Sequence, residues 1–278
     1  MAVRIVTDSA ADLTDEEAKT LDVFVVPLSI RFGTEEYVDR KDLTPAQFYA
    51  KLASATVLPE TAAPSPGAFE VAFRSCLDAG ADSVVCINIS SLLSATMASA
   101  QNAARAIEGA DIRIVDSRSI TSGLGSHVKA AAKAAAGGAS ADEVVRIVEE
   151  MVPRTRVYGA LDTLDNLKKG GRIGGAQAML GTLLSIKPII DISTGEVQQE
   201  AKPRTRTKAL QHLVDKIVAA GAVENLSVMH GQAPDIEQFL DLLAAHHPRE
   251  DIHVGDIGAT IGVHGGPRVM GVTYQVPA

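Results

Sequence analysis

The first half of the chain alternates mainly apolar runs with stretches of helical periodicity. The apolar runs lie at residues 3–6, 83–89 and 112–115, and near-continuous hydrophobicity is typical of strands covered on both faces. Helical stretches follow them, and the first of these opens at Thr14 with Glu17 three residues later, which predicts a capping box. Strands that alternate with helices predict an α/β domain built on a parallel sheet.

Two segments interrupt this rhythm. Residues 23–37 predict a hairpin with a Gly-Thr turn, which need not belong to the parallel sheet. Ser65-Pro66 predicts the start of a helix, since a capping serine followed by proline is a common opening, and Gly80 predicts its end.

The second half of the chain has a different pattern, with hairpins mixed among helices. We expect helices at about 160–169, 175–185, 207–220 and 235–246, a β-hairpin over 187–202, and strands at 252–264 and 269–276 joined by a Gly-rich turn. This mixture predicts an α+β domain with a largely antiparallel sheet. The predicted domains are therefore residues 1–154 and 155–278, with the 23–37 hairpin as a candidate member of the second one.

Composition and charge narrow the classes of partner. The chain has 278 residues, 46% of them apolar but only 4% aromatic, so any pocket should have aliphatic walls. A net charge of −8 provides no long-range attraction to nucleic acid or anionic lipid. No apolar run approaches the roughly 20 residues of a membrane span, and the start of the chain does not resemble a signal peptide. Cys76 and Cys86 form no CxxC pair, which favours reduced thiols and a cytoplasmic location.

Several polar motifs are candidates for chemistry. The segment from Ser90 to Thr96, which includes Ser94, follows a buried strand and precedes a helix, so it predicts either an anion site or an ordinary serine-rich cap. Thr61 stands in the loop sequence TAAPSPG, where its hydroxyl either meets a ligand or belongs to a loop and helix cap. The polar strand ends at Asp8, Ser90 and Asp116 allow the same two interpretations.

Basic and imidazole groups add further candidates. The sequence KKGGRIGG lacks the spacing of a phosphate loop, and it predicts a helix C-terminus followed by Arg172, whose guanidinium can hold a phosphate. Arg204 lies in a second basic cluster that is most simply solvated. His264 lies in a Gly-rich turn that a ligand can approach, and the histidines show no metal-ligand spacing, so no metal is expected.

Together these motifs resemble the DegV family of bacterial fatty-acid-binding proteins. The resemblance runs through nearly the whole chain and rests on VRIVTDS, the Pro27 to Asp39 segment, TAAPSPG, SSLLSAT, VDSRSITSGLG, KKGGRI, KPR and IGVHGGPRVMG, in that order.

The resemblance implies two domains that enclose a long-chain fatty acid as ligand, with no cofactor and no catalytic residue of the chain's own. The resemblance places the carboxylate of this fatty acid at Thr61, Ser94 and His264. It also implies a role in phospholipid metabolism, in which a partner fatty acid kinase converts the bound acid to an acyl phosphate, with Arg172 and Arg204 near the head group and the kinase-docking face. Ala95, Gly265 and Arg268 depart from the family pattern.

Two other functions remain open from the residues alone. A hydrolase or acyltransferase would pair Ser94 with His264, which requires the two side chains within hydrogen-bond reach. A binder of phosphorylated small molecules would use the polar strand ends together with Arg172.

Overall fold

The first domain is built on a four-stranded parallel sheet. The computed structural model describes residues 2–179 and 186–278. The strand order is β2 (Val23–Val26), β1 (Val3–Asp8), β6 (Ser83–Asn88) and β7 (Asp111–Asp116), and all neighbours are parallel. The predicted parallel α/β fold is therefore confirmed, and the Thr14–Glu17 capping box opens α1 (Asp15–Thr20) as expected.

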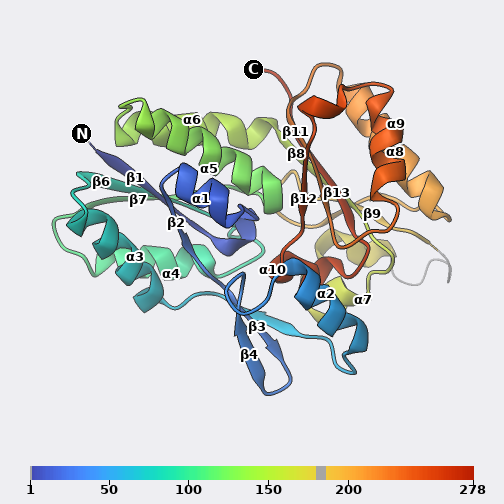
Figure 1. Cartoon of the computed structure of the whole chain (residues 1–278), viewed down its shortest axis with the longest axis horizontal. Helices are drawn as coiled ribbons and strands as arrows, with labels where there is room; N and C mark the ends of the chain where they lie inside the picture. Colours follow the sequence, from blue (N-terminus) through green and yellow to red (C-terminus); the bar gives the residue numbers. More distant parts are fainter. Residues whose placement is uncertain (1, 180–185) are drawn as a thin grey trace.

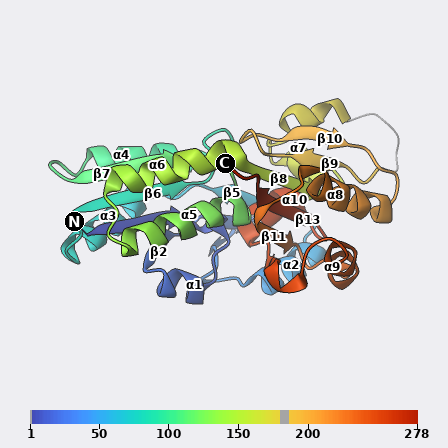
Figure 2. The same ribbon diagram turned by 90° about the horizontal axis from the view of Figure 1, so that it is seen from above.

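Helices cover both faces of this sheet. On one face lie α3 (Pro66–Asp78) and α4 (Thr96–Arg105). The apolar sides of these two helices pack against Val6, Val84 and Cys86 of the sheet. On the other face lie α5 (Thr121–Ala136) and α6 (Ala141–Met151), as Figures 1 and 2 show. The ends of the parallel strands point toward the second domain, so their loops contribute to the space between the domains.

The second domain contains a six-stranded sheet. Its order is β10 (Gln198–Ala201), β9 (Ile189–Asp191), β8 (Thr155–Ala160), β13 (Met270–Gln275), β11 (Glu224–His230) and β12 (His253–Asp256). Every pair is antiparallel except β11 with β12, which confirms the largely antiparallel sheet. The division after residue 154 stays a prediction.

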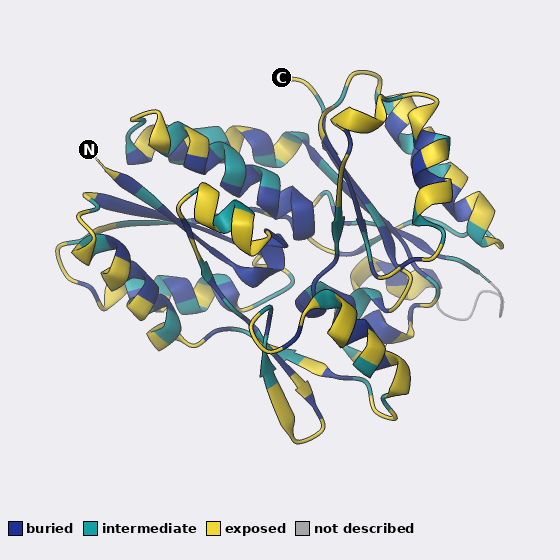
Figure 3. Cartoon of the chain, in the orientation of Figure 1, coloured by how far each residue is buried: buried dark blue, intermediate teal, exposed yellow. Residues whose placement is uncertain are grey.

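The two faces of this sheet have different partners. The outer face packs on α8 (Arg206–Ala220) and α9 (Ile236–Ala244) through a core that includes Tyr158, while Val157 belongs to the core shared with the first domain. This alternation is the period-two pattern of a strand. Figure 3 shows the buried strands between helices whose outer surfaces are exposed.

A small third sheet joins the domains. It consists of β4 (Glu35–Val38), β3 (Ser29–Phe32) and β5 (Glu60–Ala62), all antiparallel. Together with α2 (Pro45–Ser54) it packs on α10 (Ala259–Gly265) of the second domain through Phe48 and Val263. The prediction of one hairpin over residues 23–37 was wrong, because β2 joins the parallel sheet and only β3 and β4 form the hairpin, with Gly33 at positive φ in the turn.

Three further predictions in the second half need correction. The expected helix over 160–169 is the end of β8 followed by the short α7 (Asp165–Lys169), and the expected strand over 252–264 is β12 followed by the helix α10. The expected helix over 175–185 begins as a 3₁₀ segment at Gly174–Met179, and its remainder lies outside the described residues. In each case tertiary packing overrides weak local propensity.

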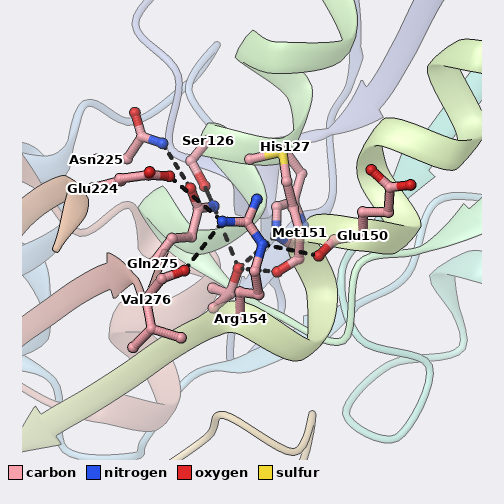
Figure 4. A network of polar contacts seen from close by, with 10 residues as sticks. Ser126, His127, Glu150, Met151, Arg154, Glu224, Asn225, Gln275 and Val276 are labelled. Atoms are coloured by element: carbon pink, nitrogen blue, oxygen red, sulfur yellow. Dashed lines mark hydrogen bonds and ion pairs between the residues drawn. The ribbon is translucent and has the colours of Figure 1, made fainter. Parts of the chain in front are cut away.

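A buried polar network crosses the domain junction near the C-terminus (Figure 4). His127 Nε2 on α5 lies 2.8 Å from Thr155 Oγ1 at the start of β8, and Thr155 donates to Met151 O at 2.9 Å. Gln275 on β13 donates to Ser126 Oγ on α5 at 3.0 Å. These bonds fix α5 against β8 and β13, and so fix the domains relative to one another.

Candidate functional site

An apolar cavity lies between the two domains. Its empty volume is about 820 Å³, including the solvent at its mouth, and its wall is mainly aliphatic. The apolar lining residues come from both domains: Leu28, Ile89, Leu93, Ile120, Val157, Leu161, Leu167, Ile190, Ile192, Val197, Ile257, Ile261 and Val269. The aliphatic wall agrees with a chain so poor in aromatic residues.

Thr61 and His264 meet at one end of this cavity. Thr61 lies on β5, where it pairs with Ile30, and His264 lies in the last turn of α10. Thr61 Oγ1 is 3.1 Å from His264 Nε2, although the residues are separated by most of the sequence. The prediction that Thr61 lies on an irregular loop was wrong, and so was the turn predicted around His264, yet the two side chains come together.

Burial keeps the His264 imidazole neutral. Loss of solvent, reinforced by the nearby Arg172 guanidinium, lowers the pKa of His264 to about 4. Its Nδ1 is buried and has no hydrogen-bond partner among residues 2–179 and 186–278. Gly170 lies directly beside the ring, because a Cβ at that position would stand only 2.7 Å from Cε1. The imidazole therefore occupies a slot that only a glycine leaves open.

Ser94 lies on the loop between β6 and α4 and also lines the cavity. Its Oγ lies 2.8 Å from Thr96 Oγ1 and accepts the Thr96 N–H at 3.3 Å. The predicted serine-rich helix cap is wrong, because α4 begins at Thr96 and its N-cap residue, Ala95, makes no side-chain hydrogen bond. Ser94 instead closes a local turn by accepting the Thr96 N–H. The structural and the ligand-binding interpretations of Ser94 are compatible, since a hydroxyl has capacity for more than one hydrogen bond.

The two candidate arginines, Arg172 and Arg204, lie in different parts of the structure. Arg172 lines the cavity, and its guanidinium donates to Leu93 O at 3.1 Å and to Gly170 O at 2.8 Å, which joins the Ser94 loop to the end of α7. Arg204 is exposed just before α8 and does not line the cavity. The structure therefore brings together Thr61, Ser94, Arg172 and His264, but not Arg204.

Two buried carboxylates hold the helix that carries His264, and the sequence reasoning missed this role. Asp39 accepts from Ser9 Oγ at 2.7 Å and from Thr260 Oγ1 at 2.6 Å. Asp12 accepts the Gly258 N–H at 3.0 Å, and burial raises its pKa to about 8. The only signal was the polar end of β1, because Asp12 looks like an ordinary surface acid in the sequence.

The other polar strand ends bond to neighbouring loops. Asp8 accepts from the Ile89 N–H at 2.9 Å, and Asp116 accepts from the Ser91 N–H at 3.2 Å. Ser90 donates to Gly195 O. None of these three side chains is part of the cavity wall that the structure describes. The polar strand ends therefore tie neighbouring loops together, and Asp8 also caps a helical turn by accepting the Ala10 N–H at 3.1 Å.

Other chemistries find little support in the described part of the chain. Among residues 2–179 and 186–278, no three His, Cys, Asp or Glu side chains are grouped so as to hold a metal ion. Cys76 and Cys86 are both buried and unbonded to each other. No described helix has the length and apolarity needed to span a bilayer. A cytoplasmic location stays a prediction.

The fold and the cavity define a two-domain α/β protein with an enclosed aliphatic space that ends in a polar cluster. A sequence model described as "Uncharacterised protein, DegV family" matches residues 2–276. The chain belongs to the DegV family.

Individual relatives are similar along their whole length. A DegV domain-containing protein of Deinococcus radiodurans is 34% identical over 99% of both chains. A solved DegV family protein of Thermus thermophilus, described by its fatty acid binding, superposes with a TM-score of 0.91 at 31% identity and full coverage of both chains. A stearic acid-binding protein of Eubacterium ventriosum superposes with a TM-score of 0.87 at 26% identity over 98% of both chains.

Proposed function

We propose that this protein binds a long-chain fatty acid in the cavity, with the carboxylate at Thr61, Ser94 and His264. The observation that carries the proposal is the meeting of Thr61 and His264 at the end of the aliphatic cavity between the domains. The fatty acids bound by the Thermus thermophilus and Eubacterium ventriosum relatives support the same ligand class.

The tail supplies most of the affinity and the polar cluster supplies the selectivity. Burying the methylenes of an octadecanoate chain gains roughly 13 kcal/mol gross, at about 0.8 kcal/mol each, and association and ordering remove much of this. A carboxylate buried without donors costs several kcal/mol, so the head group needs hydrogen bonds. The Thr61 and Ser94 hydroxyls rotate to donate, and His264 donates through whichever ring nitrogen carries its proton.

The experiment uses protein freed of lipid and titrated with octadecanoic acid and octadecan-1-ol. We expect the acid to bind more tightly, and we expect Ser94→Ala and Thr61→Val to weaken the acid about tenfold each while changing the alcohol little. Thr207→Val, which removes an exposed hydroxyl on α8 outside the cavity wall, is the matched control. Failure of the acid to bind, or equal losses for acid and alcohol, would contradict the proposal.

We also propose that the bound head group is presented to a partner fatty acid kinase, so that the protein itself is a carrier and not an enzyme. A hollow of about 1130 Å³ adjoins the cavity, and Thr61, Arg172 and His264 line both spaces. The carboxylate is thereby reachable from outside. Arg204, which is exposed, is proposed as a docking residue and Arg172 as a head-group residue.

With ATP and a fatty acid kinase, Arg204→Ala should slow acyl phosphate formation without changing fatty acid affinity. Arg105→Ala, at an exposed position on α4, is the control. Equal rates for both variants would remove Arg204 from the docking surface.

The hydrolase alternative lacks its defining contact. Ser94 Oγ bonds to Thr96 and His264 Nε2 bonds to Thr61, so no Ser94–His264 hydrogen bond exists among the described residues. A carrier therefore accounts for the geometry better than a serine-dependent enzyme.

A further inference from the structure

Thr121 carries a hydroxyl in the cavity wall that has no hydrogen-bond partner among residues 2–179 and 186–278. Thr61 and Ser94 are bonded at the head-group end, and Thr260 donates to Asp39. The Tyr158 ring packs against Tyr274 and Lys216 on the outer face of the sheet. Thr121 also lines the cavity and is only 6% exposed, yet its hydroxyl makes no hydrogen bond to any of the described residues.

Thr121 also begins a helix that has no side-chain cap. It is the first residue of α5, a helix of 16 residues, and the preceding Ile120 offers no capping group. The amides of Thr121 and Ser122 find no acceptor among residues 2–179 and 186–278. Free amides at a helix N-terminus favour an oxygen acceptor. A hydroxyl and a helix start thus lie together in the wall of a largely apolar space.

The backbone conformation of Thr121 is strained, so contacts with the surrounding residues must hold its hydroxyl in this position. Its φ is +47°, in the left-handed region that β-branched residues rarely adopt. The surrounding contacts hold it there, because the Ser122 hydroxyl is bonded to the Thr273 hydroxyl of β13 and a Cβ on Gly123 would lie 3.1 Å from Val157.

The position along the cavity follows from β13. Val269 lies beside Gly265 at the His264 end, and Thr273 lies beside the start of α5. Four residues of extended chain separate them, which is about 13 Å. An extended acyl chain advances about 1.25 Å per carbon for bonds near 1.5 Å, so a chain that runs along this segment from the His264 end reaches Thr121 at roughly its tenth carbon.

We propose that Thr121 and the start of α5 form a second polar subsite that recognises an oxygen in the middle of the acyl chain. The ligand class is a long-chain fatty acid with a hydroxyl or oxo group at about carbon 10. The inference rests on the proposed fatty acid binding, because it needs the carboxylate at Thr61 and His264 to set the register. A hydroxyl on the ligand accepts from Thr121 Oγ1 or from the α5 amides.

The test compares octadecanoic, 10-hydroxyoctadecanoic and 2-hydroxyoctadecanoic acids by calorimetry on lipid-free protein. We expect the 10-hydroxy acid to bind as tightly as the plain acid or up to about tenfold more tightly. Thr121→Val keeps the shape but removes the hydroxyl, and it should weaken the 10-hydroxy acid about tenfold while leaving the other two within twofold. Thr121→Ser should restore the preference, and Thr207→Val, at an exposed position on α8 outside the cavity wall, should not disturb it.

The outcomes separate the two proposals. If octadecanoic acid itself does not bind the unaltered protein, the proposed function fails and the subsite fails with it. If octadecanoic acid binds, but the unaltered protein rejects the 10-hydroxy acid or Thr121→Val affects all three acids equally, only the subsite is refuted. The binding of the three acids to the unaltered protein tests the subsite even if a Thr121 variant does not fold.

Discussion

Gly170 offers a way to displace the His264 imidazole without changing any polar group. The glycine ends α7 with φ −74° and ψ −3°, which alanine adopts without strain. A Cβ at this position would overlap His264 Nδ1 and stand 2.7 Å from Cε1. Gly170→Ala therefore forces the ring to move, and the 3.1 Å contact between Thr61 and His264 cannot survive unchanged.

The expected loss follows from the hydrogen bond at stake. A hydrogen bond to a charged group contributes about 1.5–3 kcal/mol, so losing the imidazole donor should weaken fatty acid binding roughly 10- to 150-fold. The free energy of unfolding should change little, because Gly→Ala at a φ/ψ that alanine accepts restricts the unfolded chain, and this stabilisation of about 0.4–1 kcal/mol offsets part of the cost of displacing the ring.

The assay is calorimetry with octadecanoate on lipid-free protein, with thermal unfolding as a check on the fold. Gly67→Ala is the matched control, because the nearest atom to its new Cβ is 3.8 Å away. If Gly170→Ala acts through the imidazole, adding it to His264→Ala should cost nothing further. A folded Gly170→Ala variant with affinity within twofold of the unaltered protein would refute the head-group role of His264.

Two predictions concern buried titratable groups. Burial lowers the pKa of His127 to about 4, so as pH falls from 7 to 4.5 the unfolded chain binds a proton at this residue and the folded chain does not. The unaltered protein therefore loses about 2 kcal/mol of unfolding free energy through His127 over this range. His127→Gln should not show this loss when unfolding free energies are measured in urea at the two pH values. Equal losses would show that His127 is protonated in the folded state. Burial raises the pKa of Asp12 to about 8, so the folded chain holds a proton that the unfolded chain has released, and this stabilisation is lost as pH rises from about 4 to about 8. The asparagine of Asp12→Asn cannot titrate, so between pH 5 and pH 8 this variant should lose less unfolding free energy in urea than the unaltered protein. An identical pH profile for the two proteins would contradict the raised pKa of Asp12.

The sequence predicted the parallel domain well because its strands carry a two-sided apolar signal. Residues 83–89 are apolar except at Ser83 and Asn88 because helices cover both faces of β6, and such a nearly continuous apolar run is typical of a strand in a parallel sheet. The second domain was predicted less well. Residues 252–264 are rich in valine, isoleucine and glycine, so α10 has no clear helical periodicity, and packing against α2 and the small sheet determines its form.

Much of the head-group cluster was found through the family resemblance rather than through physical pattern. Thr61 and His264 have no local feature that distinguishes them from other threonines and histidines, and their contact exists because β5 pairs with β3 while α10 packs on the same small sheet. Thr121 could not have been found from the sequence at all. Its importance lies in an unpaired hydroxyl and a positive φ, which are visible only in the folded chain.

The three proposed carboxylate donors come from small elements and not from either large sheet. Thr61 lies on a three-residue strand, Ser94 on a loop, and His264 on a seven-residue helix. Such short elements gain little stability from their own hydrogen bonds, so they depend on anchors. For His264 the anchors are Asp12 and Asp39 of the first domain, which bond to the first turn of α10. Because those anchors bond to Gly258 and Thr260 and not to the side chains of Thr61, Ser94 or His264, substitutions at the head group should change ligand selectivity without unfolding either domain.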